Sequence, residues 1–326
     1  MGLLLSVNEA ANLIREGQTL LFAGDEGLLR ELPRGQWVGG TIPYFMAESG
    51  GVTDHQRIFV TRLSGVVEKT TVKLYSLEDL HQMPRDYPKN GFSFILLPAG
   101  SQVHESYSRN CSTWPGFFNS PVVGWVTGVD LKDLSRIKPK VFNGLTGEWS
   151  DSKALVMHAE LPAGKFAKIR ILNLFKQGHG DVITFPNVSF EITDCLINGK
   201  PTNFFQYIRE REINTQLPLV ASYVGEMVNV SFQSVSQEQR KVMIYAPVFP
   251  GVEYRMAAPV GDYVSEFRKL ISTLPPQSTF SCNCILNFLY ADLEGKRTGS
   301  PGPMTFGEVA YMLLNQTMVY MTIESN

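Results

Sequence analysis

Two glycine-containing motifs carry groups that could bind a small charged molecule. The first contains Gly39, Gly40 and Thr41 and follows a predicted strand. Adjacent glycines free the backbone to present N–H groups to an anion, as phosphate- and carboxylate-binding loops do. The second motif ends in Gly307 and Glu308, and a carboxylate in such a turn can pair with a ligand ammonium. Together the motifs predict a cleft for a small polar metabolite, with Thr41 helping to shape it.

Each motif also has a plainer interpretation. The first matches neither the Gly-x-Gly-x-x-Gly nor the Walker pattern. It is therefore also consistent with a tight turn whose neighbours Tyr44 and Phe45 lie in the core. Glu308 can equally complement the N-terminus of a helix. The sequence alone leaves these alternatives open.

A thiol is the third candidate. Cys282 lies in a predicted strand, and the strand period places Cys284 on the same face. A catalytic thiolate needs a neighbouring base or a positive environment, and no histidine follows residue 180. The base would therefore come from the first half of the chain, as His104 or His179. This gives a second hypothesis, a Cys-dependent hydrolase or acyltransferase, against a buried inert Cys282 that only shapes a pocket.

The histidines and cysteines do not form a metal motif. No Cys-x-x-Cys pair occurs, and His179, which lies between two glycines, has no further ligands clustered around it. Ser101 lies one helical turn before His104, but the Gly-x-Ser-x-Gly elbow of serine hydrolases is absent. We predict no metal and no cofactor.

Composition excludes several classes of protein. The 326 residues are 44% hydrophobic and 18% charged, which indicates a folded chain. Lys and Arg number 29 against 31 Asp and Glu, and no basic block occurs, so we expect no nucleic acid partner. No apolar run approaches the ~20 residues that span a bilayer, so we expect no membrane association. Four scattered cysteines favour reduced thiols in a cytoplasm.

Short elements must position these residues. Strands that alternate with helices in the first half indicate a layered α/β fold, and turn-rich strands after residue 151 indicate a second α/β unit. Glycines, a proline and an asparagine collect between residues 176 and 200, so we expect two domains, 1–188 and 189–326. Ser6 and Glu9 form a capping-box pattern that predicts the start of a helix at 6–16, and Asn198-Gly199 predicts a turn. The other expected helices are 26–32, 76–83, 101–109, 201–212, 260–274 and 305–314. The expected strands are 19–23, 37–40, 58–60, 72–75, 92–97, 122–126, 154–158, 169–175, 182–185, 190–196, 217–223, 227–232, 241–248, 280–289 and 318–323.

The motifs resemble those of the FIST family, bacterial sensory proteins with FIST amino-terminal and carboxy-terminal domains. The residues that carry the resemblance are Trp37-Val38-Gly39-Gly40-Thr41, Gly51-Val52, Leu196-Ile197-Asn198-Gly199-Lys200-Pro201, Phe280-Ser281-Cys282 and Phe306-Gly307-Glu308. The segment between Cys282 and Glu308 is short for the family, Ile285 stands near where an Arg often follows the Cys, and no kinase, cyclase or chemotaxis module is attached. The resemblance implies small-ligand sensing, with amino acids as the ligand class, and no catalysis.

We therefore expect a cytoplasmic, two-domain sensory protein in signal transduction. Its ligand would contact Gly39, Gly40, Thr41, Cys282, Gly307 and Glu308. A separate signalling protein is a possible partner, and a homodimer remains open. The alternatives are the thiol-dependent enzyme and a non-catalytic subunit that recognises another protein.

Overall fold

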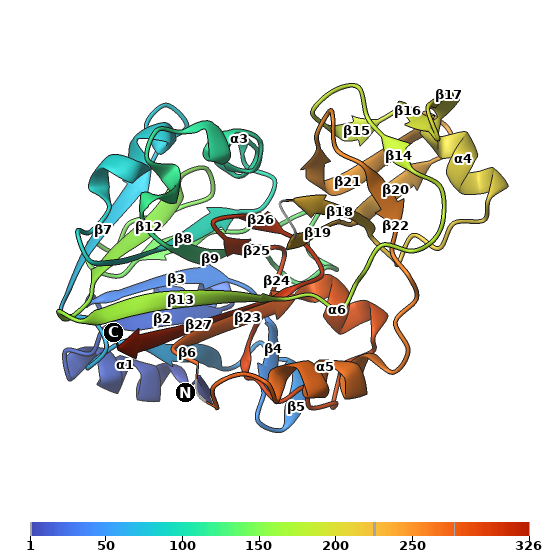
Figure 1. Cartoon of the computed structure of the whole chain (residues 1–326). Helices are drawn as coiled ribbons and strands as arrows, with labels where there is room; N and C mark the ends of the chain where they lie inside the picture. The colour runs from blue at the N-terminus through green and yellow to red at the C-terminus, as the bar shows by residue number, and fades with distance from the viewer. Residues whose placement is uncertain (1, 224–225, 277, 326) are drawn as a thin grey trace.

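The computed structural model describes residues 2–223, 226–276 and 278–325. They form sheets of mixed strand direction flanked by short helices, which confirms the predicted α/β class. Figure 1 shows a large body, in which both chain termini lie, and a smaller lobe built from the middle of the sequence. No helix within the described ranges is long and apolar enough to cross a membrane.

The first sheet of the body packs against the helices α1 (Val7–Arg15) and α2 (Glu26–Arg30). α1 begins where the sequence predicts because Ser6 and Glu9 form a reciprocal capping box. The strands of this sheet in spatial order are β1 (Leu3–Leu5), β6 (Ile58–Arg62), β2 (Leu20–Gly24), β3 (Trp37–Thr41), β10 (Val141–Asn143) and β11 (Trp149–Ser150).

The central strands of the second sheet are buried on both faces. Its central strand β8 (Gly91–Pro98) turns Phe94 to the middle of the body and Ile95 to the opposite side, as expected for a continuous apolar run. That opposite side is covered by α3 (Gln102–Asn110) and by the 3-10 segments η1 (Leu80–Asp86), η2 (Cys111–Thr113) and η3 (Phe117–Asn119). The strands in order are β26 (Met312–Leu314), β25 (Glu308–Ala310), β9 (Val122–Thr127), β8, β12 (Ala154–Glu160) and β7 (Lys69–Tyr75).

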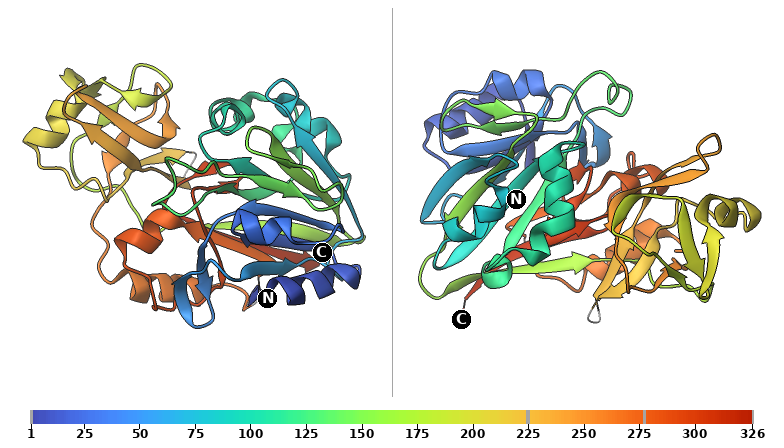
Figure 2. Two further views of the ribbon diagram at one scale, coloured as in Figure 1. Left: turned by 180° about the vertical axis from the view of Figure 1, so that it is seen from behind. Right: turned by 90° about the horizontal axis from the view of Figure 1, so that it is seen from above.

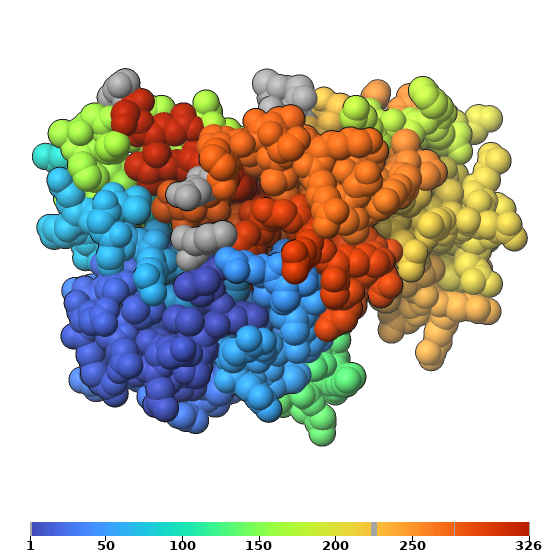
Figure 3. Space-filling view, turned by 90° about the horizontal axis from the view of Figure 1, so that it is seen from below, coloured from blue at the N-terminus to red at the C-terminus, as the bar shows by residue number. Residues whose placement is uncertain are grey.

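The third sheet combines strands from the N-terminal part of the chain with strands from its C-terminal part. The helix α5 (Tyr263–Ile271) packs on it through Phe267, and α6 (Ile285–Tyr290) follows β23 directly. The strands in order are β13 (Lys165–Leu172), β27 (Met318–Ser325), β23 (Phe280–Cys284), β24 (Gly302–Thr305), β4 (Tyr44–Ala47) and β5 (Gly50–Thr53). In the space-filling view from below, the orange and red atoms of α5 and α6 lie between the blue N-terminal part and the yellow lobe (Figure 3).

One apolar core fills the space between these three sheets. It contains Val38 of β3, Phe94 of β8 and Met321 of β27, all almost fully buried. Phe94 meets Phe280 edge-to-face, with ring centroids 5.0 Å apart. The core also takes in Cys282 and Cys284, so any site built on them lies inside the body.

The lobe has its own core under the helix α4 (Phe204–Glu210), and two further views show it beside the body (Figure 2). Its first sheet runs β17 (Lys200–Asn203), β16 (Asp194–Ile197), β14 (Ile183–Thr184), β22 (Tyr254–Met256), β18 (Leu219–Tyr223) and β19 (Glu226–Val230). Its second sheet runs β15 (Ser189–Ile192), β21 (Lys241–Val248) and β20 (Phe232–Ser236).

The strand pairings differ from the expected division at residue 188. β13 pairs with β27, β4 with β24 and β9 with β25, so each pair joins a strand that ends at or before Leu172 to the last fifty residues of the chain. The pairings therefore describe one body with a lobe inserted between β13 and α5, in place of two consecutive domains.

Two predicted elements near the C-terminus are wrong in whole or in part. Residues 305–314, expected as a helix, form the end of β24 and the β25–β26 hairpin. Their apolar residues have helical spacing, but most of these positions are buried. Apolar spacing indicates a helix only where the other face of the element is exposed to solvent, so here it does not distinguish helix from strand. The strand expected at 280–289 ends at Cys284, and α6 follows.

Candidate functional site

The structure places Gly39 and Gly40 inside β3, between the paired strands β2 and β10. Neither glycine has a positive φ. A Cβ on Gly40 would lie 2.5 Å from Thr127 Cγ2 and 2.7 Å from the Trp125 ring. Packing therefore explains why residue 40 is a glycine, because β3 and β9 approach too closely there for a side chain at this position. Thr41 Oγ1 is held by the backbone of Lys140, whose N–H donates to it at 2.8 Å.

Glu308 is fully buried at the start of β25. Its Oε2 accepts hydrogen bonds from Thr317 N at 3.1 Å and Thr317 Oγ1 at 2.7 Å. Its Oε1 has no partner among the described residues. Burial raises the pKa of Glu308 to about 8, although the hydrogen bonds from Thr317 oppose the shift. The carboxyl is therefore mainly protonated at pH 7 and unsuited to hold an ammonium.

Cys282 and Glu308 do lie in one buried cluster. Burial, followed by the Glu308 charge, raises the pKa of Cys282 and of Cys284 well above the usual thiol range. The Cys282 thiol donates to the carbonyl of Gly124, 3.6 Å away. Thr305 adjoins the cluster and bonds to the carbonyl of Gly307 at 3.1 Å. Both thiols are thus protonated and enclosed.

Gly40 and Glu308 both lie near one aromatic residue, Trp125. Glu308 is the cross-strand partner of Trp125, which places both side chains on the same face of the second sheet. The Trp125 ring approaches Gly40, since a Cβ there would lie 2.7 Å from it. Gly40 and Glu308 are both buried, and neither lines the hollows described below.

Neither histidine proposed as a base is placed against Cys282. His104 lies on α3, which covers the opposite face of β8 from the core that holds Cys282. Burial lowers the pKa of His104 to about 4. His179 lies on the surface of the lobe. This arrangement gives the thiol-dependent enzyme no geometric support.

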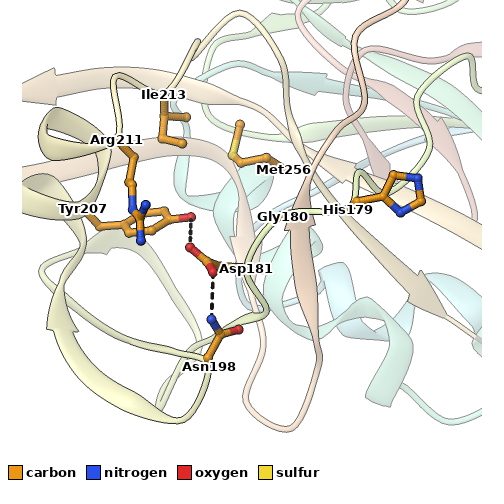
Figure 4. A pocket seen from close by; sticks show the side chains of 8 residues that line it. All are labelled: His179, Gly180, Asp181, Asn198, Tyr207, Arg211, Ile213 and Met256. Carbon is orange, nitrogen blue, oxygen red and sulfur yellow. Dashed lines mark hydrogen bonds between the residues drawn. The ribbon is translucent and has the colours of Figure 1, made fainter.

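A hollow of about 520 Å³ opens on the lobe, away from these motifs. Figure 4 shows Asp181 between Tyr207 and Asn198, with His179 turned away from it. The polar and apolar side chains that line the hollow include Asp181, Asn198, Tyr207, Arg211, Ile213 and Met256.

Two donors hold Asp181 in place. Asn198 Nδ2 donates to its Oδ1 at 2.7 Å, and the Tyr207 hydroxyl donates to its Oδ2 at 3.1 Å. Asn198 and Gly199 form the β16–β17 turn with φ of 49° and 80°, which the Asn-Gly pair predicts. Burial, followed by the Asp181 charge, raises the pKa of Tyr207 to about 12, so this hydroxyl stays a donor.

Arg211, at the end of α4, supplies the positive charge of the hollow. Its side chain is exposed, and no carboxylate lies within ion-pair distance of it in the described part of the chain. The hollow therefore combines a fixed carboxylate with a guanidinium that is free to bind an anion.

A second hollow of about 560 Å³ lies where the lobe joins the body. It is lined by Asn173 and Lys176 of the outgoing connection, by Pro259 and Gly261 of the return, and by α5. Lys269 in this hollow is paired with Glu266 at 2.7 Å.

Comparison with known families gives one match, which covers residues 5–324. The chain belongs to DUF6976, a family of unknown function. No curated protein matches the chain. The matched range spans the residues of both the body and the lobe.

The residues of the lobe hollow in this DUF6976 chain are not among the predicted site residues. His179, which lies between two glycines shortly before Asp181, and the Asn198-Gly199 turn stand out in the sequence, but no local pattern connects them. Their connection is long-range, since the hairpin turn brings Asn198 to Asp181 and α4 brings Tyr207 and Arg211. The Asn198-Gly199 pair and the segment Gly178-His179-Gly180-Asp181 were the available signals.

A buried polar chain in the second sheet was also missed. Ser93 Oγ lies 2.8 Å from His158 Nδ1, and His158 Nε2 lies 2.9 Å from the Tyr75 hydroxyl. Tyr75 donates to Asp86 Oδ2 at 2.6 Å. Polar residues inside apolar runs, Ser93 in β8 and His158 in β12, were the signal, and the two are direct cross-strand partners.

Proposed function

We propose that this protein binds a small zwitterionic metabolite of the amino-acid class in the lobe hollow, and that it acts in the cytoplasm as a non-catalytic sensory protein. The observation that carries the proposal is the pairing of a preorganised Asp181 with an unpaired Arg211 in one hollow. The resemblance of the chain to FIST sensory domains and its four unpaired thiols support the sensory role and the compartment.

The chemistry of the hollow favours a ligand with two opposite charges. Each Asp181 oxygen accepts one hydrogen bond and keeps lone pairs for a ligand ammonium. The planar guanidinium of Arg211 suits a carboxylate, which it can bind through two parallel N–H donors. Ile213 and Met256 provide apolar surface for a side chain. The volume lies within the roughly 300–1,000 Å³ of small-molecule sites.

This proposal moves the ligand away from Gly39, Gly40, Thr41, Cys282, Gly307 and Glu308. The glycines are explained by packing, and the carboxyl of Glu308 is enclosed and protonated. A non-catalytic role fits the hollow because its hydroxyl, on Tyr207, stays protonated and is therefore not an activated nucleophile. A signal would then have to pass to a separate partner protein.

A thermal-shift screen with the common L-amino acids tests the proposal. A ligand at 100 times its dissociation constant stabilises the folded protein by about 2.7 kcal/mol, which raises the midpoint by roughly 5 °C. We expect Asp181→Asn and Arg211→Gln each to reduce the shift given by the best amino acid to about half or less at the same ligand concentration. A removed charge-assisted hydrogen bond costs about 1.5–3 kcal/mol, or at least tenfold in affinity.

Matched controls lie on the same lobe outside the hollow. Arg209→Gln on α4 and Asp194→Asn on β16 change exposed residues of the same types, so both should keep the full shift. The proposal fails if no amino acid shifts the midpoint at millimolar concentration, or if the control variants lose the shift together with Asp181→Asn.

A further inference from the structure

The turn at residues 315–317 joins β26 to β27 and is almost fully buried against the lobe. Gln316 has a φ of 50°, a left-handed conformation that is unfavourable for a residue with a side chain. A strained turn persists only where its surroundings hold it, and the contacts of this turn reach both parts of the molecule.

On the lobe side, Gln316 makes two side-chain hydrogen bonds. Its Oε1 accepts from Ser231 Oγ at 2.7 Å, and its Nε2 donates to the carbonyl of Gln216 at 3.1 Å. Asn229 Nδ2, which is fully buried in β19, donates to the carbonyl of Asn315 at 3.1 Å. The lobe is thus held to this turn by directional polar contacts.

On the body side, the same turn is fixed by Thr317. The Thr317 N–H and the Thr317 hydroxyl both donate to the carboxyl of Glu308. The N–H of Cys284 donates to the carbonyl of Thr317 at 3.2 Å. The buried cluster of Glu308 and Cys284 therefore anchors the residue that follows Gln316. This accounts for the position of Glu308 without a ligand.

The lobe loop at residues 211–217 links the turn to the hollow. Arg211 and Ile213 line the hollow, and Gln216 in the same loop accepts the hydrogen bond of Gln316. The loop lies between α4 and β18. Arg211 is only a few residues along the chain from Gln216, which contacts the body. A displacement of Arg211 toward a bound carboxylate would therefore act close to that contact.

We propose that the 315–317 turn couples the lobe hollow to the body, so that an amino acid bound by Arg211 orders the 211–217 loop and strengthens its contact with Gln316. The inference rests on the proposed function, because it names how that same site is regulated. Coupling of this kind is reciprocal, so weakening the contact lowers the affinity for the ligand. Gln316 acts here as a positioning residue, since it does not line the hollow.

Gln316→Ala in the full chain tests the coupling by two measurements. Calorimetry with the amino acid that gives the largest thermal shift should show an affinity about fivefold or more below that of the unmodified protein. Hydrogen–deuterium exchange without any amino acid should be faster at 211–217 in the variant. In the unmodified protein, the amino acid should slow exchange at 315–317.

Gln239→Ala is the matched control, because it changes an exposed glutamine of the lobe far along the chain from the turn. It should leave both affinity and exchange unchanged. If Gln316→Ala does not fold, Ser231→Ala removes one of the same hydrogen bonds from the lobe side and should show the same changes to a smaller degree.

The outcomes separate this inference from the proposed function. Unchanged affinity in Gln316→Ala, with no effect of the amino acid on exchange at 315–317, overturns the coupling while the binding function stands. If no amino acid binds, the proposed function and the ligand arm of the coupling both fail. In that case faster exchange at 211–217 in the variant would show only that Gln316 stabilises the contact between lobe and body.

Discussion

His158 lies in β12 between Ser93 and Tyr75, and the direction of each hydrogen bond in this chain can be worked out. Burial lowers the pKa of His158 to about 4, with the charge of Asp86 opposing the shift, so the imidazole is neutral at pH 7. Tyr75 donates to Asp86, so its oxygen accepts from His158 Nε2–H. In the neutral ring Nδ1 then carries no proton and accepts from the Ser93 hydroxyl.

This histidine should make the protein less stable in mild acid. The unfolded chain binds a proton at His158 below about pH 6.5, whereas the folded protein resists protonation until about pH 4. The contribution of the neutral His158 to the free energy of unfolding is therefore fully present above pH 6.5. It is lost as the pH falls toward 4, by up to about 3 kcal/mol. In His158→Gln, urea unfolding between pH 7 and pH 4 should show a smaller loss of free energy.

His81→Gln provides the comparison, because His81 is an exposed histidine. It should keep the pH dependence of the unmodified protein. His104, whose pKa is also lowered to about 4 by burial, contributes a similar loss in all three proteins. Equal pH dependence in His158→Gln and the unmodified protein would contradict the role assigned to the neutral imidazole.

At the scale of elements, the close approach of β3 to β9 depends on Gly40. A Cβ there would meet Thr127 and the Trp125 ring at distances that real Cβ atoms do not show. Gly40→Ala should therefore destabilise the protein by about 1–3 kcal/mol, the usual cost of overpacking a core. The free energy of unfolding from urea titration at pH 7 measures it.

Gly27→Ala is the counterpart in α2, where a Cβ would meet nothing within 4 Å. Alanine is favoured over glycine inside a helix, so this variant should gain about 0.5–1 kcal/mol. If Gly40→Ala were as stable as the unmodified protein, β3 and β9 would be more loosely packed than the structure shows, and the glycine pair would again need a functional explanation.

Elements with local signals were predictable from the sequence. The capping box of Ser6 and Glu9 fixed the start of α1, and the Asn-Gly pair fixed the β16–β17 turn. The β25–β26 hairpin was not predictable, because its helical apolar spacing arises in a segment that is buried almost throughout. Cys282 and Glu308 lie in one buried cluster, but Thr317, which bonds to Glu308, lies in the turn between β26 and β27 and has no local sequence signal.

At the scale of the whole molecule, the inserted lobe is the feature that sequence reasoning could not provide. The connections at residues 173–182 and 257–262 contain glycines and a proline but no low-complexity linker. The return of β23–β27 to the earlier strands depends on contacts between residues about 150 to 250 positions apart in the chain. The lobe carries the hollow, and the body carries the turn that holds it. This division of roles is compatible with the sensory function that we propose.

A crystal structure grown with the best amino acid of the thermal-shift screen tests the central claim most directly. The account predicts density for that molecule in the lobe hollow, with its ammonium within hydrogen-bond distance of Asp181 and its carboxylate facing Arg211. An empty hollow with the amino acid bound elsewhere, for example beside Glu308 after the core has opened, would contradict it.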